Sequence, residues 1–252
     1  MENQRFDIIY SLGAKCDCAM NLKRASLRLC SGPFDWIGLA SFNARIDFIL
    51  NDFDGFLNAD RLIPNINAKG FQEGYVDRDG LIRFVHDFNP SLDFKEAFVL
   101  AQAKFKRRID RFYNLIKDGD KVLFIYQASI DDVSTQELKD ALEKLSSKFD
   151  KRVHILAILK NSSLKRGTVS IGNVAEGLDI CFYNDALFKW RQKAFRKKIY
   201  TKYTKLRLKT VAKRKKSIFK GFILVRILTN LIPIKSWRRR LRDSLIARGR
   251  YD

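Results

Sequence analysis

Three kinds of side chain near the start of this sequence have the chemistry of a thiol enzyme: a thiol, an imidazole and a carboxylate. Cys16 follows an apolar run at 6–10 and a short Ser-Leu-Gly turn, so we expect it where a strand turns into a helix. A helix N-terminus presents unpaired N–H groups and a partial positive charge, which stabilise a thiolate. His86, one of two histidines, ends a predicted strand and has the chemistry of a general base. The pattern predicts a Cys–His nucleophilic pair.

The residue that would orient the imidazole is open between two aspartates. Asp35 lies between two aromatic residues, where a carboxylate without a partner is costly to bury. Asp87 is adjacent to His86, but neighbouring residues of one strand point to opposite faces. We therefore favour Asp35 and keep Asp87 as its competitor. Backbone N–H groups of residues 14–16 are the expected donors to an oxyanion.

Several further residues are candidates for contact with a substrate. Three arginines on one predicted helix form either a solvated face or a clamp for a phosphate or carboxylate. The candidate substrate-binding residues are Ser11, Trp36, Arg107, Arg108 and Arg111. The turn after the first strand lacks the repeated glycines and the Lys-Ser/Thr ending of a phosphate-binding loop, and we predict no cofactor.

The cysteines at 16, 18, 30 and 181 are expected to be reduced thiols. Residues 1–7 contain acids and no sustained apolar run, which is not the pattern of a secretory signal and favours the cytoplasm. Cys16, Cys18 and Cys30 lack the spacing of a zinc ribbon and a fourth ligand, so no metal is predicted. We expect Cys18, Cys30 and Cys181 to pack in the core, and the second histidine, His154, to do the same.

The elements that must position these residues alternate along the chain. With 252 residues, 46% of them hydrophobic, the chain is long enough to bury a core. Strand-like runs lie at 6–10, 121–126, 152–159 and 178–183, helix-like segments at 14–28, 42–53, 92–117 and 134–149, and a hairpin at 69–88. Ser134 and Glu137 fit a capping box. This order predicts an α/β fold, a layered sheet with at least its central strands parallel, flanked by helices.

Positive charge is concentrated at the C-terminal end. Residues 188–252 contain 23 of the 49 Lys and Arg but two of the 28 Asp and Glu, and so carry the whole net charge of +21. We predict an α/β Cys–His catalytic domain at 1–187 and a basic, amphipathic helical tail at 188–252. This segment combines positive charge with apolar residues and tryptophans, which favours an anionic membrane surface as its binding partner over nucleic acid or another protein. The expected membrane-binding residues are Trp190, Lys197, Lys198, Trp237, Arg238, Arg239 and Arg240.

Five motifs together resemble a bacterial family of unknown function described as putative papain-like cysteine peptidases. They are Ser-Leu-Gly-x-x-Cys at 11–16, Leu-Lys-Arg-x-x-Leu-Arg at 22–28, Ser-Gly-Pro-Phe-Asp-Trp at 31–36, His-Asp-Phe at 86–88 and Arg-Arg-x-x-Arg-Phe at 107–112. The resemblance covers roughly residues 6–160. It implies a Cys–His enzyme with Cys16 as nucleophile and His86 as general base. The Cys-Gly-Ser-Cys-Trp motif of papain is missing, as is a suitable upstream glutamine for an oxyanion hole.

The segment 232–239 resembles the basic C-termini of bacterial surface-polysaccharide glycosyltransferases, which implies work at the inner membrane. The sequence thus predicts a cysteine hydrolase or acyl transferase, acting on an amide or ester bond of a peptide, acyl or glycan substrate. We expect it in the cytoplasm, peripheral on the inner membrane. Two alternatives remain: a glycosyltransferase-like or accessory protein of lipopolysaccharide or capsule biosynthesis, and a non-enzymatic membrane-docking adaptor.

Overall fold

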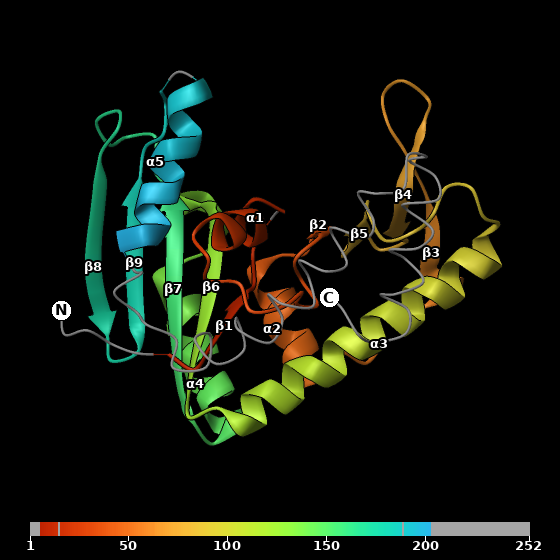
Figure 1. Ribbon diagram of the computed structural model, residues 1–252, viewed down its shortest axis with the longest axis horizontal. Coiled ribbons are helices and arrows are strands. Elements are labelled where there is room, and N and C mark those ends of the chain that lie inside the picture. Colours follow the sequence, from red (N-terminus) through yellow and green to blue (C-terminus); the bar gives the residue numbers. More distant parts are fainter. Residues whose placement is uncertain (1–5, 15, 188, 203–252) are drawn as a thin grey trace, which may run out of the picture.

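Two sheets and a long helix make up the computed structural model, which describes residues 6–14, 16–187 and 189–202. The large sheet has five strands in the order β1-β6-β7-β9-β8, and the small sheet has four in the order β2-β5-β4-β3. Helix α3 (Phe94–Asp118) runs from the base of the large sheet to the small sheet (Figure 1). One apolar cluster continues across α3 and both sheets.

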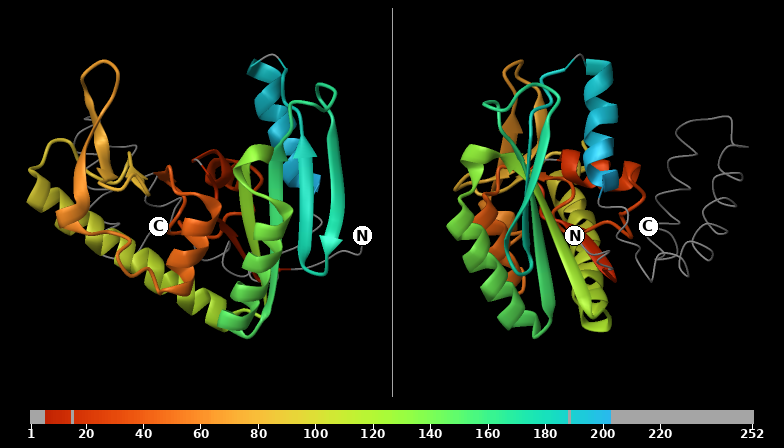
Figure 2. Two further views of the ribbon diagram at one scale, coloured as in Figure 1. Left: turned by 180° about the vertical axis from the view of Figure 1, so that it is seen from behind. Right: turned by 90° about the vertical axis from the view of Figure 1, so that its left-hand side faces the viewer.

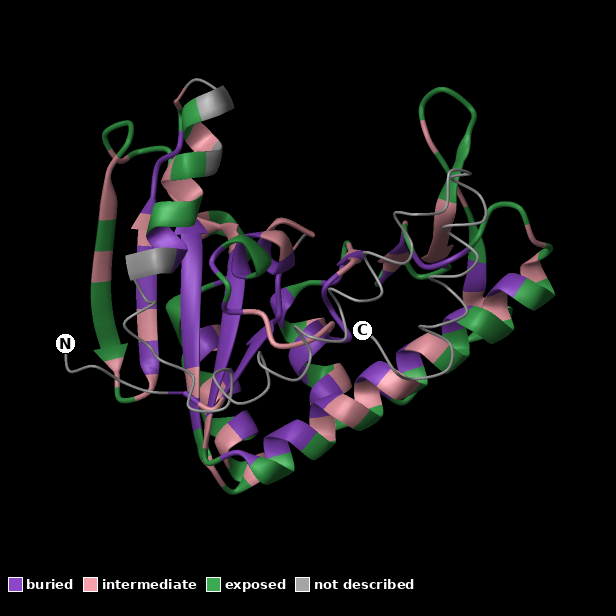
Figure 3. Cartoon of the chain, in the orientation of Figure 1, coloured by how far each residue is buried: buried purple, intermediate pink, exposed green. Residues whose placement is uncertain are grey.

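The large sheet is parallel except at one edge. Its strands are β1 (Ile8–Ser11), β6 (Lys121–Ser129), β7 (Arg152–Lys160), β9 (Leu178–Tyr183) and β8 (Val169–Ala175). The first four pair in parallel, and β8 pairs antiparallel with β9. In Figure 3 the central strands are buried, whereas much of β8 is exposed. Continuous apolar strands of this kind need cover on both faces, and the predicted α/β class is confirmed.

Successive residues of β6 pack on opposite faces, as the pleat of a strand requires. Val122 and Phe124 face α2 (Phe42–Leu50), α3 and α4 (Thr135–Phe149) in the larger cluster. Leu123 and Ile125 face α1 (Cys16–Arg24) and α5 (Lys189–Lys202) in a second cluster. Figure 2 shows α4 and α5 on opposite sides of the sheet. The predicted capping box of α4, Ser134 with Glu137, is present.

The small sheet was only partly expected. The predicted turn before Gly80 is present, with φ of +71° at that glycine, and joins β4 (Gln72–Asp77) to a short β5 (Arg83–Phe84). β5 also pairs with β2 (Ile37–Gly38), and β4 with β3 (Leu62–Ile66), which the sequence did not predict. The 3₁₀ turns η1 (Ala59–Arg61) and η2 (Ile130–Asp132) complete the elements.

Helix α5 is the described part of the predicted basic tail. Its Ile199 and Tyr200 are 2% and 1% exposed, because they pack in the cluster that also holds α1. The division of the chain at 187/188 therefore stays a prediction. Trp237, Arg238, Arg239 and Arg240 lie outside the described residues. Within 6–14, 16–187 and 189–202, the structure has no helix with the length and apolarity that crossing a membrane requires.

Candidate active site

The structure places Cys16 at the first residue of α1, half-buried, directly after the turn that leaves β1. Backbone bonds fasten this turn to β6: Leu12 N–H donates to Ile125 O (2.8 Å) and Ala14 N–H to Gln127 O (3.2 Å). The buried Ser11 accepts from Gly13 N–H at 3.2 Å, so its hydroxyl supports the turn. The Ala14 N–H is thus already bonded, a correction to its expected role as an oxyanion donor.

The electrostatics of Cys16 differ from the expectation of a preformed thiolate. Burial raises the pKa of its thiol above the ordinary value, and the helix N-terminal N–H of Cys16 itself lowers it by less. The charges of Asp17 and Asp87 raise this pKa further, and Arg83 lowers it. Because the cost of burying a thiolate outweighs the effect of one N–H group, the resting thiol is protonated and needs a base.

His86 is exposed and lies just after β5, in a loop rather than at a strand end. Its ring packs edge-on against Trp36, with 6.3 Å between the ring centroids, and the Arg28 guanidinium lies 5.4 Å from the Trp36 ring. Among the described residues, Cys16 and His86 share no hydrogen bond. The charges that act on the Cys16 thiol nevertheless include Arg83 and Asp87, which flank His86 in sequence.

The favoured orienting acid, Asp35, is held by other groups. Its side chain is 3% exposed and pairs with Arg28, whose Nε lies 2.9 Å from Oδ2, and it also accepts from Gly32 N–H at 3.0 Å. Burial raises the pKa of Asp35, although the charge of Arg28 and the Gly32 N–H oppose the rise. These bonds close the loop between α1 and β2. Within the described residues Asp35 has no hydrogen bond to His86.

The competing acid, Asp87, is bound to α3. Its side chain is 1% exposed, and Oδ1 lies 2.8 Å from Lys104 Nζ and 3.5 Å from an Arg108 nitrogen. Asp87 Oδ2 is buried and has no hydrogen-bond partner among the described residues. Burial lowers the pKa of Lys104, which the charge of Asp87 opposes. Asp87 therefore ties the loop that carries His86 to α3 and keeps one carboxylate oxygen available.

The three arginines of α3 do not form the solvated face that was one expectation. Arg108 is buried against Asp87, and Arg111 donates to the Ser31 carbonyl oxygen at 3.1 Å, while Arg107 is half-buried. Arg108 and Arg111 thus tie the loops at 31–35 and 86–88 to α3. Their role as a clamp for a substrate anion stays a prediction.

Of the remaining cysteines and the second histidine, Cys18 and Cys181 lie in the core, whereas Cys30 and His154 are half-buried. All four cysteines are free thiols, Cys18 and Cys181 are buried, and Cys30 is half-buried with its sulfur 3.8 Å from the Tyr10 hydroxyl. His154 packs edge-on against Phe6 at 4.9 Å, and burial lowers its pKa. The described residues hold no group of three or more His, Cys, Asp or Glu suited to a metal ion.

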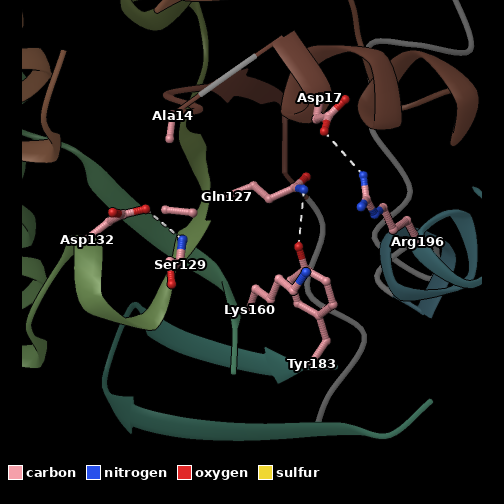
Figure 4. Close-up of a pocket in the computed structure, with 9 residues that line it drawn as sticks. Ala14, Asp17, Gln127, Ser129, Asp132, Lys160, Tyr183 and Arg196 are labelled. Atoms are coloured by element: carbon pink, nitrogen blue, oxygen red, sulfur yellow. Dashed lines mark hydrogen bonds and ion pairs between the residues drawn. The ribbon is translucent and has the colours of Figure 1, made fainter. Parts of the chain in front are cut away.

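A polar pocket of about 250 Å³ opens at the carboxyl edge of the large sheet, beside the turn that carries Cys16 (Figure 4). Ligands of open α/β sheets commonly bind at this edge. Ion pairs hold both of its cations: Arg196 lies 3.2 Å from Asp17 and 2.5 Å from Asp185, and Lys160 lies 3.2 Å from Asp185. Asp132 accepts a hydrogen bond from the Ser129 N–H at 2.7 Å. The lining residues are Ala14, Asp17, Gln127, Ala128, Ser129, Asp132, Lys160, Tyr183 and Arg196.

Sequence reasoning missed this pocket. A signal was present, because the apolar strands end in polar residues such as Gln127, Lys160 and Asp185. Polar residues at the carboxyl ends of parallel strands meet at one edge, but their pairing with Arg196 depends on where α5 packs. Lys197 and Lys198 of the same helix are exposed, and their role at a membrane stays a prediction.

The comparison with protein families connects these residues to a known group. Residues 7–160 match the model of a family described as "Putative papain-like cysteine peptidase". The chain belongs to this family. The match spans β1 through β7 and so includes the whole segment that holds Cys16, Asp35, His86 and Asp87, whereas α5 lies beyond it.

Among curated proteins, the chain is similar to an uncharacterised protein, R408, of Acanthamoeba polyphaga mimivirus. The two are 28% identical over an alignment of 182 residues, and the match covers 63% of this chain and 79% of the relative. The bacterial setting expected from the sequence stays a prediction, since this relative is viral. No solved structure matches the chain.

Proposed function

We propose that this family member is a cysteine hydrolase in which Cys16 attacks the carbonyl carbon of an amide or ester. The most direct support is the family match, and an electrostatic link between two distant segments of the chain accompanies it. Cys16 begins α1, and the charges of Arg83 and Asp87, on either side of His86, act on its thiol. Both segments lie within the region that matches the family.

The proposed reaction begins with transfer of the thiol proton to His86, because burial keeps Cys16 protonated at rest. His86 is exposed, and exposed side chains change rotamer on the picosecond to nanosecond timescale. A turn of the imidazole away from Trp36 is thus the motion that would bring it to the sulfur. Asp87, with its unpartnered Oδ2, is the better placed of the two acids to orient a ring that has turned inward.

The polar pocket is the proposed place for the substrate groups beside the scissile bond. Ala14 and Asp17 line it and lie on either side of Cys16 in the chain. Both of its cations are already paired with carboxylates, which favours a polar group without net charge over a strongly anionic one. A peptide, an acyl ester and a glycan ester all offer such a group. Acyl transfer would follow the same first step and differ from hydrolysis only in the group that accepts the acyl chain from Cys16.

A peripheral position at an anionic membrane surface is a separate part of the proposal. It is supported by the sequence, whose residues 188–252 carry all of the net charge of +21. The proposed location is the cytoplasmic face of a membrane. The roles in polysaccharide biosynthesis and as an adaptor stay alternatives, and both predict that loss of the Cys16 thiol leaves the protein's activity in its host unchanged.

The test is acylation by p-nitrophenyl acetate, followed by release of p-nitrophenolate and by mass spectrometry of the intact protein. We expect an acetyl group on Cys16, none after Cys16→Ala, and a rate about 10²–10⁴-fold lower after His86→Ala. Cys30→Ala and His154→Asn are the matched controls and should retain the rate. Acylation of Cys16→Ala at the rate of the parent protein would refute the proposal.

A further inference from the structure

The pairing of two short strands places Trp36 beside His86. Ile37 of β2 lies opposite Phe84 of β5, and both are buried in the apolar core. Trp36 directly precedes β2, and His86 lies in the loop that follows β5. Because β2 and β5 run antiparallel side by side (Figure 1), the two rings meet at the same end of this strand pair.

The contact between the two rings has the geometry of an aromatic pair. The ring centroids are 6.3 Å apart and the ring planes are inclined at 85°, which is within the range of attractive edge-to-face pairs. Within the described part of the chain, the imidazole of His86 makes no hydrogen bond. The contact with Trp36 is therefore the interaction that gives this exposed imidazole a preferred orientation.

Trp36 is itself held by Arg28. The guanidinium carbon of Arg28 lies 5.4 Å from the centroid of the Trp36 ring, which is close enough for a cation–π contact. The guanidinium is fixed in turn by Asp35, with 2.9 Å between Nε and Oδ2, and by Ser31, with 2.9 Å between Nη2 and Oγ. Since the Arg28 side chain is 14% exposed and bound at two positions, it keeps the indole in one place.

The loop at 31–36 is a firm support for this stack of side chains. Asp35 accepts a hydrogen bond from Gly32 N–H at 3.0 Å, and Arg111 of α3 donates to the Ser31 carbonyl oxygen at 3.1 Å. These bonds close the loop and tie it to α3. The exposed imidazole at the outer end of the stack is the part that can change rotamer readily.

In the orientation that packs on Trp36, the imidazole is not engaged with the thiol. Within residues 6–14, 16–187 and 189–202, Cys16 and His86 share no hydrogen bond, and the ring contact of His86 is with Trp36. A group that spends most of its time in another orientation reacts more slowly, in proportion to the fraction of time in the competent one.

We propose that Trp36 is a positioning residue that holds His86 in a resting orientation, and that Arg28 fixes Trp36 for this role. The inference rests on the proposed function, in which the imidazole turns from Trp36 towards the sulfur. It gives the Ser-Gly-Pro-Phe-Asp-Trp motif a role, because Asp35 holds Arg28 and Arg28 holds the indole. Loss of the ring contact should then make the general base more available.

The first test is the rate at which p-nitrophenyl acetate acylates Cys16. Trp36→Leu removes the ring contact and should raise this rate about 2–10-fold, which is the strength of one aromatic pair expressed as a change in population. Trp36→Phe keeps a smaller ring and should give a smaller increase. General damage to the site would lower the rate, so the sign of the change separates the two effects.

The matched control is Phe71→Leu. Phe71 lies between β3 and β4 and is 68% exposed, so this variant removes an aromatic ring outside the site and should leave the acylation rate unchanged.

The second test asks whether Trp36 acts through His86. Adding Trp36→Leu to His86→Ala should give no increase over His86→Ala alone, because the group that the first substitution releases is then missing. An equal increase with and without His86 would overturn the role, since Trp36 would then act on the thiol or on the ester directly.

The third test observes the contact itself by indole fluorescence. A protonated imidazole quenches an indole that it touches, so the emission of the parent protein should fall between about pH 8 and pH 5, where histidines titrate. Most of this fall should be lost in His86→Ala and retained in His154→Asn, whose parent ring packs against Phe6. The same fall in His86→Ala as in the parent protein would refute the contact.

An acylation rate of Trp36→Leu that is equal to or below that of the parent would overturn the role of Trp36. If this variant does not fold, the rate of Trp36→Phe decides in the same way. If the parent protein shows no acetyl group on Cys16, the proposed function is wrong, and the role of Trp36 in it is wrong too. The parent protein alone therefore distinguishes the two failures.

Discussion

The substitution Asp87→Asn tests how the loop that carries His86 is held. Asp87 is 1% exposed and lies 2.8 Å from Lys104 Nζ and 3.5 Å from an Arg108 nitrogen. The Asn side chain keeps the shape and one acceptor oxygen but removes the charge. Two cations on α3, whose side chains are 24% and 10% exposed, then lose their counter-charge.

The size of the effect follows from these distances. At 2.8 Å the direct attraction between Asp87 and Lys104 is about 6 kcal/mol with an effective dielectric constant of about 20. Desolvation offsets part of it, and breaking such a buried pair usually costs about 3–5 kcal/mol. Since Lys104 retains some contact with water, we expect a loss of about 3 kcal/mol in the free energy of unfolding, which is a fall of about 6–12 °C in melting temperature.

The same substitution should make the Cys16 thiol more reactive, although it makes the fold less stable. The charge of Asp87 raises the pKa of the Cys16 thiol, so its removal lowers that pKa and increases the thiolate fraction at neutral pH. Alkylation by iodoacetamide at pH 7.5 should therefore be faster. If Asp87 also orients His86, acylation by p-nitrophenyl acetate should become slower in the same variant.

The assays are urea unfolding and the two labelling rates, with the exposed Asp54→Asn as the control for loss of one negative charge. A change in unfolding free energy within about 0.5 kcal/mol, the range of ordinary surface substitutions, would refute the buried ion pair. Slower alkylation of Cys16 in Asp87→Asn would refute the electrostatic link between the two residues.

Two further predictions concern α5 and the segment after it. Burial raises the pKa of Asp185. Arg196 and Lys160 lower it by their hydrogen bonds and their charges, and together these effects are larger, so the pKa in the folded protein lies below the ordinary value. The ionised carboxylate therefore stabilises the fold above about pH 3.9, and this stabilisation is lost as pH falls through the folded pKa. Asp185→Asn should lower the free energy of unfolding in urea by about 3 kcal/mol at pH 7 and by less below pH 4. An equal loss at both pH values would contradict this. Removal of residues 203–252 should abolish sedimentation with phosphatidylserine vesicles, and the binding of the full chain should weaken between 50 and 300 mM salt. Vesicle binding by the shortened chain equal to that of the full chain would place the membrane contact elsewhere.

The sequence by itself determined the class of the fold and the position of Cys16. The apolar runs at 121–126 and 152–159 match buried parallel strands, because such strands are covered on both faces and need no polar alternation. The Ser-Leu-Gly-x-x-Cys motif placed the thiol at the start of a helix, since a strand followed by a tight turn leaves little other choice. The strands and the thiol could be predicted because each depends on a pattern within one short segment of the chain.

Tertiary structure alone decided which charges meet. Asp35 pairs with Arg28 within one loop, whereas Asp87 pairs with residues of α3 and acts on Cys16, about 70 positions away in the chain; nothing in the spacing of these residues ranks one above the other. The pKa of Cys16 depends on burial, which a helix N-terminus does not reveal. Arg83 and Gly38 become neighbours only through the pairing of β2 with β5, two strands of two residues each that are too short to leave a pattern in the sequence.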